Sequence, residues 1–203
     1  MKKILIFDFD GTIADTKSIY YKAIYNEVKR FGYSYKDVDN VVDLGLNLKS
    51  VLRKLGLSFI TTLFLHRRIM KNIHKYVDEV KKCKDAGSIK DIKENKILIT
   101  NSLKEFVIPI LKHFNLNCFK EIYGAEDFGD KSEFIKEYLN KNMIKGKDCY
   151  YIGDRASDAK IAKKAGCNSI IISGKCAWDS RTEILKEKPD FIIGDIKDLN
   201  KII

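Results

Sequence analysis

The sequence predicts an α/β protein, with one parallel β-sheet covered by helices on both faces and a separate helical unit inserted near its start. Three observations lead to this fold class. Short apolar runs of strand length recur along the 203 residues, helical patterns lie between them, and one interval of about ninety residues, between Asp10 and Thr100, contains no convincing strand. Strands that are apolar on both faces and alternate with helices are typical of a parallel sheet buried between helical layers.

Six apolar runs are expected to form the strands. Most are β-branched or aromatic, and most end at Gly, Ser, Thr or Asp, which are common turn residues. In chain order the runs are Ile4–Phe7, Ile97–Ile99, Ile122–Tyr123, Tyr150–Ile152, Ile170–Ile172 and Phe191–Ile193. With helices on both sides they predict a Rossmann-like three-layer sandwich, in which ligands bind at the carboxyl ends of the strands.

Helices between these strands are predicted from apolar residues at helical spacing. One covers Leu103–Phe114, and a second covers Phe134–Leu139 with Ser132 as the expected N-cap. A third covers Ile161–Ala165 and is expected to stop at Gly166.

The long strand-free interval is expected to form a helical insertion, because a single crossover needs only about thirty residues. We expect an α/β core domain at residues 1–14 and 85–203, and a helical cap domain at residues 15–84 that hangs over the strand ends. The alternative is that these helices simply extend the main core. Two apolar stripes are expected to be buried: Tyr20, Ala23, Ile24, Val28 and Phe31, then Ile60, Leu63, Phe64, Met70, Ile73, Val77 and Val80.

The formal charge of +10 raises the question of a nucleic-acid partner. The lysines are spread along the whole chain without a dense block, and arginine, the residue enriched in base and phosphate recognition, is scarce. We therefore expect a solvated lysine surface and no nucleic-acid partner, although the charge would still attract an anionic substrate.

Nothing in the sequence indicates a membrane or an export pathway. No segment approaches about 20 continuous apolar residues, and the N-terminal apolar run is too short for a signal peptide. The five cysteines include no C-x-x-C pair, so they are expected to be reduced thiols in a cytoplasmic protein.

Polar residues gather just past the ends of several predicted strands, where a parallel sheet can bring them into one crevice. The groups are Asp8 and Asp10, then Thr100-Asn101-Ser102, then Lys131 at the start of a helix, and finally Asp154 and Asp158. Four carboxylates in one place repel one another unless a cation lies between them. Carboxylate oxygens suit a small hard cation, so we expect Mg²⁺, with the hydroxyl, the lysine and backbone N–H groups free to bind a phosphate.

These residues resemble the motifs of a known family. Asp8-Phe9-Asp10-Gly11-Thr12 looks like the first motif of the haloacid dehalogenase superfamily. Thr100, Lys131 and Gly153-Asp154 with Asp158 resemble its second, third and fourth motifs, in the same order. The position of the helical insertion is similar to the phosphoglycolate-phosphatase-like branch of subfamily I, whose cap follows the first motif. Two positions depart from the pattern without removing a catalytic group: Ser132 stands where many relatives have proline, and Arg155 where serine is common.

The resemblance implies a phosphatase that works through an aspartyl-phosphate. Asp8 would be the nucleophile, and Asp10 would protonate the leaving oxygen and later take a proton from water. Mg²⁺ would be held by the Asp8 carboxylate, the Asp10 backbone carbonyl and Asp154, with Asp158 in the surrounding layer or holding ligand waters.

The remaining motif residues would bind the phosphoryl group or support the loop. Thr100, the N–H of Asn101 and Lys131 would contact the phosphoryl oxygens, while Gly11 permits a tight turn that Thr12 supports. The substrate expected from the resemblance is a small phosphorylated metabolite.

Several alternatives stay open at this point. A phosphomutase would use the same residues and differ in how its cap excludes water. A dehalogenase typically lacks the second acid, so Asp10 argues against it, and the intact set of acids argues against a non-catalytic relative. We expect Arg155 to form a local salt bridge and Trp178 to be a packing residue, but the sequence does not decide either role.

Overall fold

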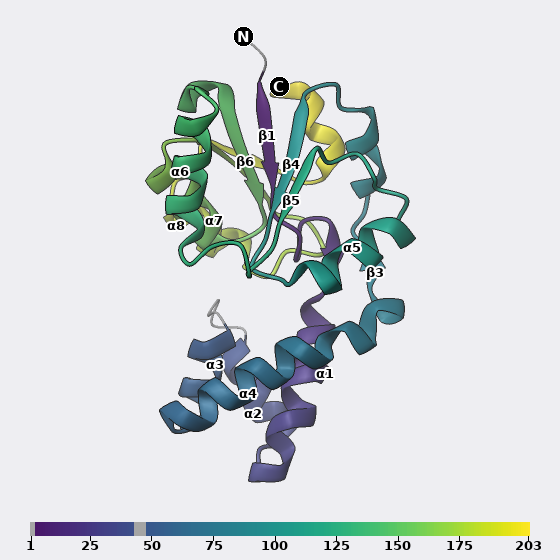
Figure 1. Ribbon diagram of the computed structural model, residues 1–203, viewed down its shortest axis with the longest axis vertical. Helices are drawn as coiled ribbons and strands as arrows, with labels where there is room; N and C mark the ends of the chain where they lie inside the picture. Colours follow the sequence, from purple (N-terminus) through teal and green to yellow (C-terminus); the bar gives the residue numbers. More distant parts are fainter. Residues whose placement is uncertain (1–2, 43–47) are drawn as a thin grey trace.

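A six-stranded parallel sheet forms the centre of the computed structural model, which describes residues 3–42 and 48–203 (Figure 1). Its strands are β1 (Ile4–Phe7), β4 (Asn95–Ile99), β5 (Glu121–Tyr123), β6 (Cys149–Gly153), β7 (Asn168–Ile172) and β8 (Phe191–Ile193). Their order across the sheet is β5-β4-β1-β6-β7-β8, and every pair is parallel. Each of the six predicted runs is a strand, which confirms the expected fold class.

The two faces of the sheet pack into separate apolar clusters, as the two-residue period of a strand requires. In β1, Ile4 and Ile6 join one cluster, with residues of α6 (Lys131–Lys141) and α7 (Ala156–Ala165). Leu5 and Phe7 join the other, with residues of α5 (Lys104–His113). All four β1 residues are buried because both faces are covered, and α8 (Arg181–Lys186) packs beside α7.

The strand order places the ends of β1 and β6 side by side. From β1 the chain moves to β4 and β5 on one side, then crosses to β6, β7 and β8 on the other. Phe7 pairs with Ile152, and the backbone N–H of Asp8 donates to the carbonyl of Ile152 at 2.8 Å. This reversal of direction is the place where open α/β sheets bind ligands.

Helix ends in this region are set by specific caps. Gly166 ends α7 with a φ of 79°, as predicted, because a left-handed residue without Cβ is favoured there. The predicted N-cap of α6 is wrong: Asp130, not Ser132, accepts hydrogen bonds from the backbone N–H groups of Ser132 and Glu133. Helix α6 therefore begins at Lys131, and Ser132 lies inside its first turn.

The segment between β2 (Ala14–Asp15) and β3 (Lys81–Lys82) is helical, and we call it the helical lobe. It contains α1 (Lys17–Val28), α2 (Tyr35–Val42), α3 (Leu48–Lys54) and α4 (Phe59–Asn72); residues 43–47 lie outside the described residues. The described residues also include five short 3₁₀ helices: Lys29–Phe31, Ile73–Glu79, Ala86–Asp91, Gly146–Asp148 and Ile196–Lys201.

The linkers of the lobe form a small antiparallel pair that the sequence did not indicate. Ala14 pairs with Lys82 and Asp15 with Lys81. Strands of two residues are too short to produce an alternating pattern, which explains why none was predicted here.

The lobe has an apolar cluster of its own, built from residues of α1 to α4, while Ile19, Tyr20, Ile73 and Val80 near the linkers join the core cluster. Part of the predicted burial is wrong. Ile60, Phe64 and Leu63 are 80%, 56% and 37% exposed, and Phe31 is 47% exposed. The buried face of α4 carries Met70, as expected, together with Thr62, Leu65 and Ile69, which the stripe did not include.

The error in α4 has a simple cause: apolar residues surround the helix on more than one face, and only the face toward α1 and α3 finds a partner. The second predicted stripe also crosses a boundary, because α4 ends at Asn72 and a 3₁₀ helix follows at Ile73–Glu79.

Figure 1 shows the lobe beyond the carboxyl ends of the strands, with α5, α6 and α7 beside the sheet. The division into two domains at the predicted boundaries stays a prediction. Over the described residues, none of the helices combines the length and the apolar character needed to cross a membrane.

Candidate active site

Asp8 lies directly after β1 in a position fixed by two hydrogen bonds. One of its carboxylate oxygens accepts from the backbone N–H of Phe9 at 2.8 Å and from the ammonium group of Lys131 at 3.1 Å. Both Asp8 and Lys131 are buried. A buried carboxylate without a positive partner would be strongly destabilising, and Lys131 at the start of α6 supplies that partner for Asp8.

Asp154 and Asp158 lie at the junction of β6 and α7. Asp158 accepts from the backbone N–H groups of Asp154 at 3.1 Å and Arg155 at 2.9 Å, which satisfies free donors at the start of the helix. Asp154 accepts from the backbone N–H of Trp178 at 2.7 Å. Asp158 thereby fixes the backbone that carries Asp154.

The carboxylates of Asp8, Asp154 and Asp158 form a compact group. One oxygen from each lies within 4.8 Å of the others, and all three residues are buried. Burial and the neighbouring Asp158 hold the pKa of Asp154 well above its usual range, and burial and Asp8 raise the pKa of Asp158 to about 6.

A divalent cation fits this group, since it would offset both the burial and the mutual repulsion of the carboxylates. Asp8 and Asp154 can each offer an oxygen, the hard donor that Mg²⁺ prefers. Both oxygens of Asp158 already accept hydrogen bonds, from two backbone N–H groups and from the hydroxyl of Tyr151. This favours a supporting place for Asp158 over direct coordination.

Asp10 has different surroundings. One of its oxygens accepts from the hydroxyl of Thr16 at 2.7 Å, and the other from the hydroxyl of Ser102 at 2.7 Å. Burial, followed by the charge of Asp8, raises the pKa of Asp10 to about 6. A carboxyl group with this pKa can exchange a proton near neutral pH, as a general acid or base must.

A hydrogen-bonded chain connects Asp10 to the helical lobe. The hydroxyls of Ser102 and Tyr20 lie 2.6 Å apart. Because Ser102 uses its single hydrogen toward Asp10, Tyr20 is the donor in this pair. Tyr20 lies on α1, and Thr16 is the residue that precedes α1, so two lobe residues help to orient Asp10.

The loop after β1 depends on Gly11. Its φ is +71°, and a Cβ placed there would lie 2.2 Å from Asp154 Oδ2 and 2.6 Å from the ring of Trp178. Neither the conformation nor the space admits a side chain. Thr12 is buried beside it and donates to Asp154 Oδ1 at 3.4 Å.

The expected phosphate-binding residues surround the same strand ends. Thr100 is buried, accepts from the N–H of Ser102 at 3.1 Å and donates to Asp10 at 3.4 Å. Asn101 is exposed beside it, while Lys131 lies against Asp8. The structure therefore brings together all the residues singled out from the sequence.

Sequence reasoning missed three residues of the site: Thr16, Tyr20 and Tyr151. The hydroxyl of Tyr151 accepts from Lys131 at 3.0 Å and donates to Asp158 at 3.3 Å. In the sequence it was one apolar residue in a strand. Ser102 stood in a polar group that was noticed, but it received no role. Thr16 stands directly before a helix, where threonine often acts as a cap, but its hydroxyl makes no cap hydrogen bond and donates to Asp10 instead.

Arg155 and Trp178 close the edge of the site. Arg155 forms the expected local salt bridge, with Asp179 at 3.3 Å. The indole ring of Trp178 lies 5.4 Å from the Arg155 guanidinium and 5.5 Å from the Tyr20 ring. Trp178 is thus a packing residue, as expected, and its backbone also orients Asp154.

Comparison with known proteins agrees with this site. The phosphoglycolate phosphatase of Aliivibrio fischeri is 23% identical to this chain, and the match covers 94% of this chain and 95% of the relative. The phosphoglycolate phosphatase of Aquifex aeolicus is 24% identical, and the match covers 99% of this chain and 96% of the relative. A solved hydrolase of the haloacid dehalogenase-like family from Streptococcus pneumoniae has the same fold, with a TM-score of 0.80, 17% identity, and coverage of 100% of this chain and 99% of that one.

The family itself is shown by a sequence model that matches residues 5–172, described as haloacid dehalogenase-like hydrolase. That range includes every motif residue discussed above, and the relatives agree with the resemblance to the phosphoglycolate-phosphatase-like branch. The chain belongs to the haloacid dehalogenase-like hydrolases.

Proposed function

We propose that this hydrolase is a Mg²⁺-dependent phosphatase that cleaves a small phosphate monoester through an aspartyl-phosphate on Asp8. One observation carries the proposal: two carboxylates two residues apart have opposite surroundings. Asp8 contacts the ammonium group of Lys131, whereas Asp10 is held by two hydroxyl groups and has its pKa raised to about 6. Paired acids with different environments are typical of a nucleophile and an acid–base partner.

In the first step, the Asp8 carboxylate attacks phosphorus, and the bond from phosphorus to the leaving oxygen breaks. The hydrogen bonds from Phe9 and Lys131 hold one oxygen of Asp8 and fix the orientation of the group. Asp10, in its protonated form, gives its proton to the leaving oxygen. Such proton transfer typically contributes about 10²–10⁴-fold to the rate.

In the second step, water hydrolyses the aspartyl-phosphate. Asp10 is now a carboxylate and accepts a proton from the attacking water, so that Asp8 and inorganic phosphate are released. The hydrogen bonds from Thr16 and Ser102 favour this ionised form of Asp10, whereas burial opposes it. The balance between these effects allows one group to work in both directions.

The metal and phosphate sites follow from the same residues. Mg²⁺ would be held by the carboxylates of Asp8 and Asp154 and by the backbone carbonyl of Asp10, and it would supply positive charge between an anionic nucleophile and an anionic substrate. Lys131, Thr100 and the N–H of Asn101 are proposed to bind the phosphoryl oxygens, where charge increases in the transition state.

We propose that residues 15–84 are a cap that closes over this site and selects the substrate. The support is the position of the lobe beyond the strand ends and the contact of its Thr16 with Asp10. Because two relatives are named phosphoglycolate phosphatase, phosphoglycolate is the first candidate among small phosphorylated metabolites.

The proposal is tested by incubating the protein with Mg²⁺ and a panel of phosphate monoesters: phosphoglycolate, sugar phosphates, nucleoside monophosphates and nitrophenyl phosphate. We expect phosphate release from at least one metabolite, and none from the Asp8→Asn variant. Transfer of a labelled phosphoryl group to a second sugar phosphate would instead identify a phosphomutase. A folded protein that releases no phosphate from any ester would contradict the proposal.

A further inference from the structure

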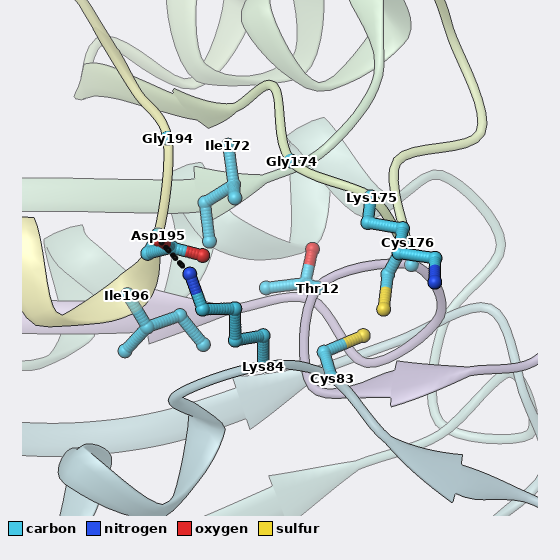
Figure 2. A pocket seen from close by; sticks show the side chains of 11 residues that line it. Thr12, Cys83, Lys84, Ile172, Gly174, Lys175, Cys176, Gly194, Asp195 and Ile196 are labelled. Atoms are coloured by element: carbon cyan, nitrogen blue, oxygen red, sulfur yellow. Dashed lines mark hydrogen bonds and ion pairs between the residues drawn. The ribbon is translucent and has the colours of Figure 1, made fainter.

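Two cysteines far apart in sequence meet at the base of the lobe. Cys83 directly follows β3, where the chain returns to the core, and its backbone N–H donates to the carbonyl of Ile13 at 2.9 Å. Cys176 lies in the turn after β7, in which the N–H of Ala177 donates to the carbonyl of Gly174 at 3.1 Å. Both line one surface pocket, and Figure 2 shows their sulfur atoms pointing toward each other.

The two thiols interact directly. The proximity of the two thiols lowers the pKa of Cys176 and raises that of Cys83. The backbone N–H of Lys84 and the charge of Lys175 act in the same direction on Cys176. Cys176 is half-buried, whereas Cys83 is buried. The more exposed sulfur is therefore also the one whose thiolate is better stabilised, as an attacking thiol requires.

A second pair in the same chain provides a comparison. Cys149 and Cys167 are also neighbours, since Cys167 raises the pKa of Cys149, but both residues are buried within the cluster between the sheet and α7. Burial raises the pKa of Cys149 further. A thiol reagent in solution has no access to this pair in the folded protein. The two cysteine pairs therefore differ in their accessibility to solvent, although the cysteines in each pair are neighbours.

We propose that Cys83 and Cys176 form a redox-active dithiol that a small disulfide, such as oxidised glutathione, converts into an intramolecular disulfide. The Cys176 thiolate attacks one sulfur of the reagent, its S–S bond breaks, and one glutathione leaves as a thiolate. Cys83 loses its proton and attacks the Cys176 sulfur, which releases the second glutathione. The two cysteines are oxidised by two electrons in total, and one glutathione disulfide is reduced to two thiols.

A disulfide between Cys83 and Cys176 would lie close to residues that orient the proposed phosphatase site. Cys176 is two residues before Trp178, whose N–H binds Asp154, and three before Asp179, which accepts from the N–H of Ala156 at the start of α7. Cys83 continues one of the two linkers of the lobe. The disulfide would join the loop that orients Asp154 to a linker of the lobe, and it would restrain movement between them.

The cross-link is tested first without any activity measurement. The full-length protein is equilibrated with glutathione buffers of increasing oxidising strength, alkylated, digested and analysed by mass spectrometry. We expect a linked pair of peptides containing Cys83 and Cys176, with a mass lower by about 2 Da than their sum, that disappears on treatment with dithiothreitol. Cys83→Ser and Cys176→Ser should each abolish the link, and Cys118→Ser should leave it intact.

Three outcomes would overturn the inference: no link at a potential where Cys118 is already modified, a stable mixed disulfide on Cys176 alone, or a link between Cys149 and Cys167 instead. The restraint is tested separately in the same oxidised sample. We expect kcat to fall and to recover with dithiothreitol in the wild type but not to change in Cys176→Ser, which lacks the attacking thiol. A complete cross-link that leaves kcat unchanged would contradict the restraint, and an inactive reduced protein would contradict only the proposed phosphatase.

Discussion

Two groups of carboxylates meet at the end of β1, and they are held by different parts of the molecule. We call Asp8, Asp154 and Asp158 the core-held group, because their hydrogen-bond partners among the described residues belong to the sheet region. Asp10 is the lobe-linked carboxylate, because Thr16 bonds it directly and Tyr20 does so through Ser102. Asp8 and Asp10 differ in their support although only Phe9 lies between them in the sequence.

This difference would separate the positioning of the metal and the nucleophile from the control of proton transfer. In the proposed mechanism, the direct hydrogen bonds of the core-held group would stay in place when the lobe moves, so a metal and a nucleophile would be positioned before the substrate arrives. The lobe-linked acid would lose its contact with Thr16 if the proposed cap moved away. Proton transfer can therefore depend on the position of the lobe, while metal binding does not. The predictions below test this contrast, from the largest expected effect to the smallest.

Removal of the metal should abolish activity, and the core-held carboxylates alone should account for the loss. With a chelator, we expect phosphate release to stop, because the buried carboxylates repel a phosphate when no cation offsets their charge. Mg²⁺ should restore activity, and Ca²⁺ should restore it poorly because it accepts looser coordination. Phosphate release measured after exhaustive chelation checks this, and full activity in that assay would contradict the assignment.

Asp8→Asn should remove the covalent intermediate entirely. The amide cannot form an acyl phosphate, so no label from a radioactive or mass-tagged substrate should appear on the peptide that contains Asp8. Magnesium affinity should fall as well, because a charged donor is lost. A label that survives this substitution would assign the nucleophile to another residue.

Asp10→Asn should keep metal binding and lose about 10²–10⁴-fold in kcat, because only proton transfer is removed. Nitrophenyl phosphate needs no protonation of its leaving group, so with this substrate the first step should be spared. The aspartyl-phosphate should then accumulate, because activation of water is still impaired. Single-turnover labelling of the Asp8 peptide measures this, and an equal loss of magnesium binding in both aspartate variants would remove the proposed contrast.

Tyr20→Phe tests the connection to the lobe. It removes one donor from the chain that ends at Asp10 and should lower kcat by about 2- to 10-fold, the equivalent of one net hydrogen bond. If Tyr20 positions the acid, the loss should be smaller with nitrophenyl phosphate than with an alkyl phosphate. Tyr35→Phe, on the exposed surface of the lobe, serves as the control. Equal losses with both esters would indicate a merely structural role for Tyr20.

Asp130→Ala should have the smallest effect on catalysis and a measurable one on stability. Asp130 caps α6 immediately before Lys131, so its loss should lower the free energy of unfolding by about 1 kcal/mol. Asp130→Asn keeps an N-cap acceptor and should be nearly neutral. Chemical denaturation of both variants makes this comparison, and indistinguishable midpoints would show that the cap contributes nothing.

The sheet was predictable from the sequence because each of its strands carries the same short-range signal. A strand buried on both faces must be apolar throughout, and six short runs carry that signal. The core-held residues were predictable for the same reason, because they follow strand ends in a parallel sheet. The N-cap of α6 was misplaced by two residues, since aspartate and serine are both good caps and the pattern does not choose between them.

The helical lobe was less predictable. Phe59, Ile60 and Phe64 are exposed on α4 although they are as apolar as its buried face, so periodicity could not select the side that packs. The lobe-linked contacts of Asp10 were missed because they join three separate segments. No spacing rule connects Tyr20 with Ser102, which are 82 residues apart in the chain.

The pairing of β2 with β3 holds the two ends of the lobe next to each other, so the lobe is joined to the core at one place. Its two ends leave and re-enter the core at neighbouring hydrogen-bonded residues, Ala14 and Lys82. An insertion whose ends already lie together can grow, shrink or be exchanged at small entropic cost to the rest of the chain, because the cost of closing a loop rises only slowly with its length. The same α/β core could thus carry lobes of different size and shape, each joined through the same pair of two-residue strands.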